Sequence, residues 1–235
     1  MIGIFDSGVG GLCAFLELRR ILPREEMIYL SDRRNAPYGT KTKDELIALT
    51  RKDIKRLADM GADKILIACC TASTLWNELD DGEKEITVPI IAPAARIAAL
   101  GKRVLVIATE HTVSTGAFGR EIRLACPECE VFEMARQRLV GLIESGCRDG
   151  RVGRECLAEL DEISGFAREF HADTLVLGCT HFSHLEGTLG DRLPGVRIVS
   201  PAREGAREIA KTSGGGGCRG KIIYTDATAL GIKEE

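Results

Sequence analysis

Two cysteines occupy matching places in a repeated phrase, and their spacing suits proton transfer. Residues 62–71 read ADKILIACCT and residues 172–180 read ADTLVLGCT, so Cys69 aligns with Cys179 at an offset of 110 residues (179 − 69). Each phrase is an apolar run of the kind that forms a buried parallel strand. Ligand crevices of open α/β sheets lie at the carboxyl ends of strands. Two similar lobes would therefore bring one thiol to each side of a ligand, as moving a proton between the two faces of a carbon requires.

Each thiol also has a purely structural interpretation. A single cysteine at a buried strand end is usually a small inert hydrophobic residue. The duplicated pair, each member followed closely by a threonine, favours function instead. Helix amino termini or a histidine lower the pKa of a thiol from about 8.5, and a helix is expected after each of the two cysteines. His181, two residues after Cys179, could relay its proton, or it could simply be a hydrogen-bonded turn histidine.

Two glycine-containing loops are further candidates. The segment DSGVGG, Asp6–Gly11, stands between an expected strand and an expected helix. It is either an anion cradle at a helix amino terminus or a tight turn that needs glycine dihedral angles. Asp6 favours the first, because an acid at a strand end beside a crevice is a candidate proton handler. The segment PYGT, Pro37–Thr40, is either a simple turn or a loop whose backbone N–H groups and Tyr38 bind a carboxylate.

The remaining pattern alternates strands with helices, which predicts parallel sheets joined by right-handed crossovers. Strands are expected at 2–5, 27–30, 64–68, 88–92, 103–107, 130–135, 174–177, 196–199 and 221–225. Helices are expected at 12–22, 44–60, from after 71 to 79, from 93, from about 117, and at 138–145, 151–170 and 203–211, with a turn at 109–116. We expect residues 1–92 and about 200–235 to form one lobe and 93–199 the other. The site would lie between them.

Size and composition describe an ordinary soluble protein. The chain has 235 residues, 44% of them hydrophobic and 29% charged, which suits one or two globular domains. A formal charge of −3 gives no indication of a nucleic-acid or membrane surface. No apolar run approaches the roughly 20 residues of a membrane span. The first residues, MIGIFDSGVGG, lack the features of a signal peptide. We therefore expect a cytoplasmic protein.

Nine cysteines are many for such a chain, and in the cytosol they are expected to be reduced. Four without any pattern around them are expected to be small core residues: Cys13, Cys147, Cys156 and Cys218. Cys126 and Cys129 form a CxxC motif, CPEC. A structural zinc site needs about four ligands, and no second CxxC exists. We therefore expect no metal and interpret CPEC as a surface turn containing Pro127.

Five segments together resemble the glutamate racemases, cofactor-independent members of the aspartate/glutamate racemase superfamily. They are IGIFDSGVGGL at 2–12, APYGTKT at 36–42, IACCTAST at 67–74, VIATEHTVSTGAF at 106–118 and LGCTHF at 177–182. The resemblance implies an α/β enzyme with two similar parallel-sheet lobes, related by a pseudo-two-fold axis through the site. It also implies interconversion of L- and D-glutamate by two bases, with no pyridoxal phosphate or other cofactor and no metal.

In that family the D-isomer feeds peptidoglycan synthesis, which implies a role in bacterial cell-wall biogenesis and cell shape. Glutamate would then be the small-molecule partner, with no nucleic acid and no membrane involved. We also expect a homodimer.

The resemblance carries over to individual residues. It implies that Cys69 and Cys179 are the two bases, that Asp6 assists Cys69, and that His181 assists Cys179. Glu144, in GLIESG, occupies the place of a supporting carboxylate. The implied substrate-binding residues are Asp6, Ser7, Pro37, Tyr38, Gly39, Cys70, Thr71, Thr112, Thr180 and His181.

Departures from the family pattern leave alternatives open. The family has CNTA at its first cysteine, where this chain has Cys70 in place of the Asn. That Asn is both donor and acceptor toward the substrate. The second motif continues as FSH where a Pro is usual, and Ser200 stands where an Asp is common. The alternatives are a racemase of another small amino acid such as aspartate, or a non-catalytic amino-acid-binding homologue. A redox pair of Cys69 and Cys70 is disfavoured, because vicinal disulfides are sterically awkward.

Overall fold

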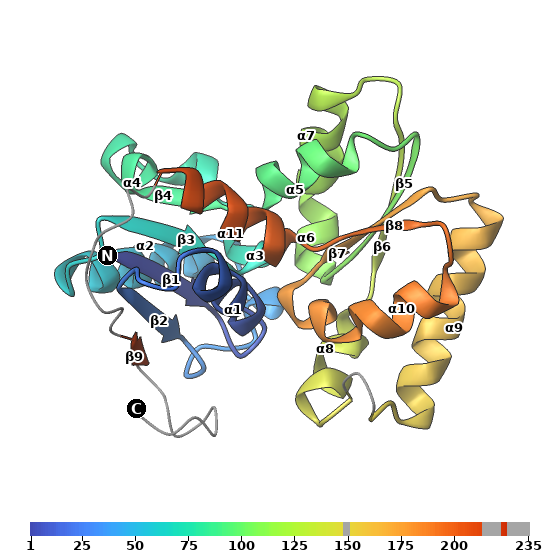
Figure 1. Cartoon of the computed structure of the whole chain (residues 1–235), viewed down its shortest axis with the longest axis horizontal. Coiled ribbons are helices and arrows are strands. Elements are labelled where there is room, and N and C mark those ends of the chain that lie inside the picture. The colour runs from blue at the N-terminus through green and yellow to red at the C-terminus, as the bar shows by residue number, and fades with distance from the viewer. Residues whose placement is uncertain (148–150, 213–221, 225–235) are drawn as a thin grey trace.

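Two parallel sheets lie side by side in the computed structural model, which describes residues 1–147, 151–212 and 222–224 (Figure 1). In spatial order the first sheet consists of β4 (Thr87–Pro89), β3 (Lys64–Ile67), β1 (Ile2–Asp6), β2 (Met27–Ser31) and β9 (Ile222–Tyr224). The second consists of β6 (Glu130–Ala135), β5 (Arg103–Ala108), β7 (Thr174–Gly178) and β8 (Arg197–Val199). Every described pairing is parallel, which confirms the predicted fold class.

The two sheets repeat one strand order. The order β2-β1-β3-β4 of the first sheet matches β6-β5-β7-β8 of the second, with β9 added beside β2. The register matches as well, because Ile2 pairs with Lys64 in the first sheet and Val104 pairs with Thr174 in the second. The strands β3 and β7, which lead to Cys69 and Cys179, therefore occupy equivalent places in two similar lobes.

Helices cover both faces of each sheet, as parallel sheets require. The described α-helices are α1 (Leu12–Ile21), α2 (Lys43–Asp59), α3 (Cys70–Ser73), α4 (Asp81–Ile86), α5 (Ile91–Ala98), α6 (Glu110–Thr115), α7 (Ala117–Ala125), α8 (Gln137–Glu144), α9 (Arg154–Glu169), α10 (Glu186–Arg192) and α11 (Pro201–Thr212). Short 3₁₀ helices are η1 (Tyr38–Thr40), η2 (Trp76–Glu78) and η3 (Thr180–Leu185). Within the described ranges, no helix has the length and apolar character needed to cross a membrane.

Helix α2 shows how local signals set an element. The Thr42 side chain accepts from the backbone N–H of Glu45, and the Glu45 side chain accepts from that of Thr42, which closes a capping box. At the other end Gly61 has a φ of 95°, a left-handed conformation that glycine adopts without strain. The helix is thus fixed at both ends, and its inner face packs on the first sheet.

Three helix predictions were wrong in detail. Residues 109–116, expected to be a turn, contain α6, because the Thr109 side chain caps the helix by accepting from the N–H of Thr112. The helix expected after residue 71 is two short pieces, α3 and η2. Helix α5 begins at Ile91, which leaves Pro93 inside its first turn, where a missing N–H has no helical partner to lose.

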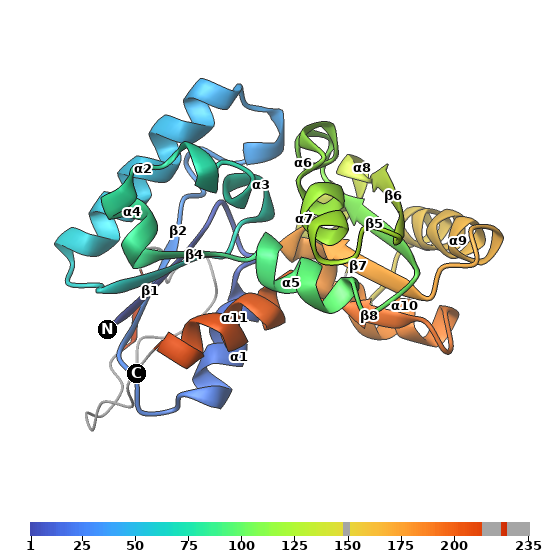
Figure 2. The ribbon, with the colours of Figure 1, turned by 90° about the horizontal axis from the view of Figure 1, so that it is seen from above.

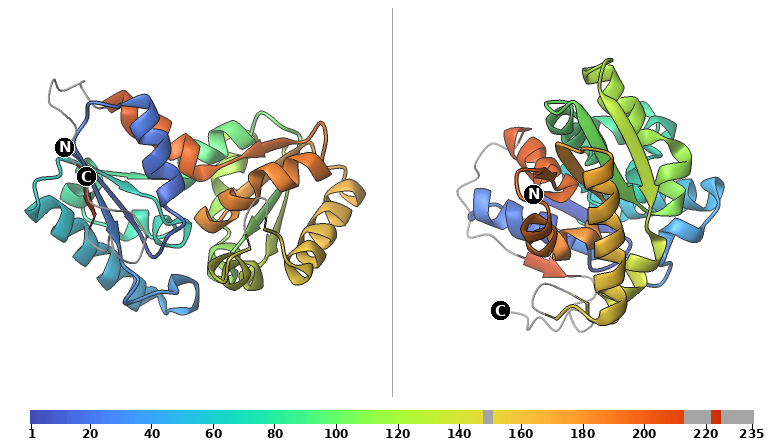
Figure 3. Two further views of the ribbon diagram at one scale, coloured as in Figure 1. Left: turned by 60° about the horizontal axis from the view of Figure 1, so that its bottom comes forward. Right: turned by 90° about the vertical axis from the view of Figure 1, so that its right-hand side faces the viewer.

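The lobes share part of their core. One apolar cluster contains residues of α1, α11 and β1 together with residues of α5, α7, β5 and β7, so it extends from one sheet to the other. Figure 2 shows α5 and α11 between the lobes. A second cluster packs α2 against the opposite face of the first sheet, and a third packs α8, α9 and α10 on the second. Figure 3 shows α9 on the outer side of the second lobe.

The expectation that all cysteines are reduced was wrong for one pair. Cys147 and Cys156 form a disulfide, because the end of α8 and the start of α9 bring their Cα atoms within 6.7 Å. Cys126 and Cys129 form the expected turn, in which the Cys129 N–H donates to the Cys126 carbonyl over 3.1 Å. Cys218 lies outside the described residues.

Candidate active site

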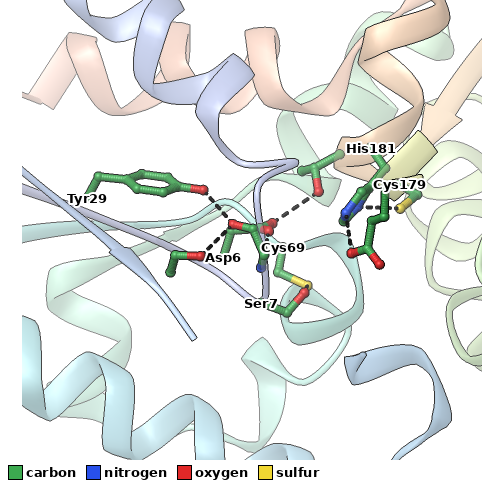
Figure 4. A network of polar contacts seen from close by, with 10 residues as sticks. Asp6, Ser7, Tyr29, Cys69, Cys179 and His181 are labelled. Atoms are coloured by element: carbon green, nitrogen blue, oxygen red, sulfur yellow. Dashed lines mark hydrogen bonds and ion pairs between the residues drawn. The ribbon is translucent and has the colours of Figure 1, made fainter. Parts of the chain in front are cut away.

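Cys69 and Cys179 both face one pocket between the lobes. Each follows a strand of its own sheet, β3 or β7, and each comes directly before a helical segment, α3 or η3. Both side chains are almost fully buried, and both line the same cavity. Figure 4 shows the two groups of polar contacts around the thiols. The internal repeat therefore does bring its two thiols to a common space.

Cys69 has a hydroxyl and a nearby carboxylate of the first lobe as its polar neighbours. Its sulfur lies 3.6 Å from the Ser7 hydroxyl. Burial, followed by the nearby charge of Asp6, raises the pKa of the Cys69 thiol to about 12. Asp6 is itself fully buried and accepts a hydrogen bond of 2.8 Å from the backbone N–H of Gly8. At neutral pH Cys69 is consequently a thiol, a form that can deliver a proton.

Cys179 has a histidine as its partner. The Cys179 sulfur lies 3.7 Å from His181 Nδ1, and His181 Nε2 lies 3.2 Å from Glu144 Oε1. Burial alone would lower the pKa of His181, but hydrogen bonds to Cys179 and to Glu144 outweigh it and raise that pKa to about 10. The same contact with His181 lowers the pKa of Glu144. At neutral pH His181 is an imidazolium, a donor toward both the sulfur and the carboxylate.

Hydrogen bonds cross between the lobes at the site. Thr180 Oγ1, in η3, donates to Asp6 Oδ2 over 3.0 Å. On the other side Thr71 Oγ1, in α3, lies 3.2 Å from Thr109 Oγ1 and 3.4 Å from Thr112 Oγ1. Each of the two thiols is therefore followed by a threonine that contacts the opposite lobe.

The glycines of DSGVGG are needed for close approach. None of them has a positive φ, so the interpretation based on glycine dihedral angles was wrong. A Cβ on Gly10 would instead collide with Thr180 Oγ1 and would lie 2.7 Å from the His181 backbone nitrogen. The second lobe thus presses directly on this loop. The Gly8 N–H binds Asp6, which places an acid rather than an external anion against that part of the loop.

Most of the predicted site residues line the pocket. The residues around it are Ser7, Ala36, Pro37, Tyr38, Gly39, Cys69, Cys70, Thr71, Thr109, Gln137, Val140, Glu144, Cys179, Thr180 and His181. Asp6 and Thr112 are absent from this lining and reach it through Thr180 and Thr71. The cavity measures about 20 Å³, which is room for about one water molecule. A bound amino acid therefore needs more room than the pocket offers in this conformation.

Sequence reasoning missed four lining residues: Ala36, Thr109, Gln137 and Val140. Thr109 could have been found from the repeat, because the strand registers equate β1 with β5 at an offset of 102 residues (104 − 2). That offset places Thr109 where Ser7 stands in the first lobe. Nothing in the local sequence marks Gln137 or Val140, which the start of α8 brings to the pocket.

Cys70 adds a third thiol to the pocket wall. It is the first residue of α3 and is almost fully buried. Burial, followed by the nearby Cys179 and Cys69 sulfurs, raises the pKa of the Cys70 thiol. Cys70 is thus a neutral, weakly polar group beside the thiols of Cys69 and Cys179. In the part of the chain that the structure describes, no group of three or more His, Cys, Asp or Glu side chains is arranged to hold a metal ion.

Known proteins resemble the chain over most of its length. The sequence profile of the Asp/Glu/Hydantoin racemase family matches residues 17–209. A glutamate racemase from Gloeobacter violaceus is 39% identical over 217 residues, which are 89% of this chain and 79% of that protein. A glutamate racemase from Desulforudis audaxviator is 39% identical over 207 residues, 86% of this chain and 74% of that protein.

Solved structures share the fold. Glutamate racemase from Francisella tularensis in complex with D-glutamate superposes with a TM-score of 0.86 at 24% identity, covering 100% of this chain and 94% of that chain. Escherichia coli glutamate racemase, in complex with L-glutamate and the activator UDP-MurNAc-ala, has a TM-score of 0.73 at 27% identity, covering 97% of this chain and 91% of that chain.

Proposed function

Because the chain belongs to the Asp/Glu/Hydantoin racemase family, we propose that it interconverts L- and D-glutamate in the pocket between its two sheets. It is an amino-acid racemase, an isomerase. The observation that supports this most is the pair of thiols, Cys69 and Cys179, that line one cavity from opposite lobes. Curated relatives at 39% identity bear the name glutamate racemase.

Cys69 and Cys179 are the two bases of the proposed mechanism. One sulfur, as a thiolate, removes the proton from Cα and becomes a thiol. The opposite thiol delivers its proton to the other face of the carbon and becomes a thiolate. The sum is inversion at Cα with one proton taken up and one released. For the next turnover in the same direction, the two sulfurs must exchange protonation states with solvent.

The two thiol environments differ in the way this reaction needs. Burial and Asp6 keep Cys69 protonated, while the His181 imidazolium places a positive charge beside the Cys179 sulfur. A histidine within reach of a thiol can take up and return its proton. Asp6 and His181 therefore assist Cys69 and Cys179 respectively, and Glu144 supports His181 through its 3.2 Å contact.

The remaining residues of the pocket bind the substrate. The Cα–H of an amino acid is a weak acid in the absence of a cofactor, so oriented donors and exclusion of water must stabilise the carbanionic transition state. Threonine hydroxyls, backbone N–H groups and the Tyr38 loop can hold the two carboxylates and the amine. The proposed set is Asp6, Ser7, Pro37, Tyr38, Gly39, Cys70, Thr71, Thr112, Thr180 and His181.

The biological setting follows from the product. D-glutamate would feed peptidoglycan synthesis, and with it cell-wall biogenesis and cell shape. A related enzyme has been solved with a UDP-MurNAc-ala activator, a compound that fits this setting. We further propose a cytoplasmic homodimer that works without a cofactor, with residues 1–92 and about 200–235 as one lobe and 93–199 as the other.

Proton NMR in deuterated water tests the function directly. Purified protein is incubated separately with L-glutamate and D-glutamate, and aspartate is run in parallel because Cys70 could alter the substrate. Loss of the Cα proton signal from both glutamate enantiomers, with inversion, is the expected result. Exchange on aspartate alone would mean that the mechanism is right and that the substrate is aspartate. If no amino acid tested exchanges its Cα proton, the chain is better described as a binding protein.

A further inference from the structure

The Tyr38 hydroxyl contacts two carboxyl groups at once. Tyr38 belongs to the PYGT loop and lines the pocket. Its oxygen lies 2.7 Å from Asp32 Oδ2 and 3.0 Å from Asp53 Oδ2. Asp32 follows directly after β2, whereas Asp53 projects from the buried face of α2 and is only 2% exposed. Neither acid belongs to a motif around the two thiols.

Counting protons decides which group donates. A phenol has one proton and can satisfy one carboxylate. Asp32 also accepts from Asn35 Nδ2 on both of its oxygens, at 3.0 and 2.9 Å, so both of them act as acceptors. The Tyr38 proton therefore goes to Asp32, over the shorter contact. The Asp53 contact is attractive only when Asp53 itself carries a proton and donates it to the Tyr38 oxygen.

The electrostatics of the cluster agree with this count. Burial, followed by the charge of Asp32, raises the pKa of Asp53 to about 7. The contact with Tyr38 and the charges of Lys52 and Arg56, its neighbours on α2, act in the opposite direction but more weakly. Burial, followed by Asp53 and Asp32 and then by Cys69 from the sheet side, raises the pKa of Tyr38. Among the described residues, no basic group offsets the effect of burial and Asp32, so Asp53 carries a proton below about pH 7.

We propose that protonated Asp53 is a positioning residue, which fixes Tyr38 and with it the substrate loop Pro37–Gly39 against the pocket. This inference rests on the proposed function, because it assigns the loop to the glutamate site. When Asp53 loses its proton, two carboxylates face one phenolic proton, and one contact becomes repulsive. The loop is then released. The chain thus couples substrate affinity to pH through a group that does not touch the substrate.

The substitution Asp53→Asn separates positioning from mere packing. An asparagine amide donates to the Tyr38 oxygen as the protonated acid does, but it does not ionise. The matched control is Asp59→Asn, an exposed acid on the same helix that pairs with Lys55 over 2.8 Å. Between pH 6 and 8.5 we expect the KM for glutamate of the wild type and of the control to rise about fivefold more than the KM of Asp53→Asn. A change of about fivefold corresponds to the net contribution of one hydrogen bond. The value of kcat should follow the same pH profile in all three. An identical pH dependence of KM in all three proteins would overturn the proposal.

A second measurement needs no activity. A carboxyl whose pKa is higher in the folded state stabilises the fold at low pH, and that contribution is lost as pH rises. The free energy of unfolding of the wild type, relative to that of Asp53→Asn, should therefore decrease between pH 3.8, the ordinary pKa of an aspartate, and about pH 7. Above pH 7 the difference should level off. Urea unfolding across that range measures it, and a flat difference would contradict the inference.

The two experiments also distinguish the proposals. If the protein has no racemase activity but still shows this pH-dependent stability, the proposed function is wrong and the protonation of Asp53 is confirmed. If Asp53→Asn fails to fold, carbon-13 NMR of the wild type decides. One aspartate carboxyl must then titrate near pH 7, and titration of every aspartate below about pH 5 overturns the inference.

Discussion

Thr180 Oγ1 donates a 3.0 Å hydrogen bond to Asp6 Oδ2, and these two residues come from different lobes. Asp6 ends β1, whereas Thr180 directly follows Cys179. The bond therefore joins the acid beside one thiol to the residue next to the other thiol. The threonines Thr71 and Thr109 make the corresponding contact on the opposite side. The two halves of the site are consequently held together at the site itself, and its geometry depends on how closely the lobes approach.

Gly10 tests this dependence. A methyl group there would push against the backbone nitrogen of His181, 2.7 Å away, so we expect Gly10→Ala to separate the lobes. Overpacking of this kind costs about 1–3 kcal/mol of stability, and kcat/KM for glutamate should fall because the thiols lose their alignment. Urea unfolding and racemisation assays measure the two effects.

Gly141 provides the control. It lies in α8 near the site, but a Cβ there would meet nothing within 4 Å. Gly141→Ala should leave activity unchanged and could only strengthen the helix, because alanine has the higher helix propensity. Equal losses of activity in both variants would show that the close approach at Gly10 is unimportant.

Each thiol should be indispensable for inversion. Serine at Cys69 or Cys179 retains the size of the side chain but is a far weaker acid. We expect either single substitution to lower racemisation by at least about 10³-fold, within the range for loss of a general acid or base. Chiral analysis of the product after incubation with each enantiomer measures this. Full racemisation by either variant would contradict the two-thiol mechanism.

Much of this site could be predicted from the sequence, since its main residues directly follow strands. Apolar runs mark β3 and β7, and the carboxyl ends of parallel strands meet at one edge of the sheet. Cys69 and Cys179 were found in this way. Glu144 was assigned by resemblance alone, and the structure places it 3.2 Å from His181. The fold followed from the same alternation of strands and helices.

Contacts between distant segments could not be predicted. Asp53 is a charged residue in an amphipathic helix, where such residues normally face solvent, but the structure buries it in contact with Tyr38. The helix α6 was missed because threonine and serine favour turns as well as helix caps, and the hydroxyl of Thr109 decided between them. The pairing of Cys147 with Cys156 depends on how α8 meets α9, which no local pattern encodes.

Glu144 should set the alkaline limit of activity. Hydrogen bonds to Cys179 and Glu144 raise the pKa of His181 to about 10. Because this pKa is raised in the folded state, the pair stabilises the fold below the ordinary histidine value of 6.5 and loses that effect as pH rises through about 10.

Glu144→Gln removes the charge, so the alkaline limb of the kcat/KM profile should move to lower pH. At neutral pH we expect a loss of about tenfold, the factor for one hydrogen bond to a charged group. An unchanged pH profile would show that Glu144 does not act through His181.

The disulfide Cys147–Cys156 should stabilise the second lobe without entering the chemistry. It closes a short loop with a sequence separation of 9 between the end of α8 and the start of α9. A cross-link of that span reduces the conformational entropy of the unfolded chain, which raises the free energy of unfolding by about 2–3 kcal/mol. Replacing both cysteines by serine should lower the free energy of unfolding by that amount, and dithiothreitol should do the same to the wild type but not to the double variant. Glu144 is the last residue of α8, three residues before Cys147, so the double variant should also show whether the link keeps Glu144 in contact with His181. Unchanged kcat/KM with reduced stability would assign the disulfide to the fold alone. If dithiothreitol changed the stability of neither protein, the disulfide would not form in solution.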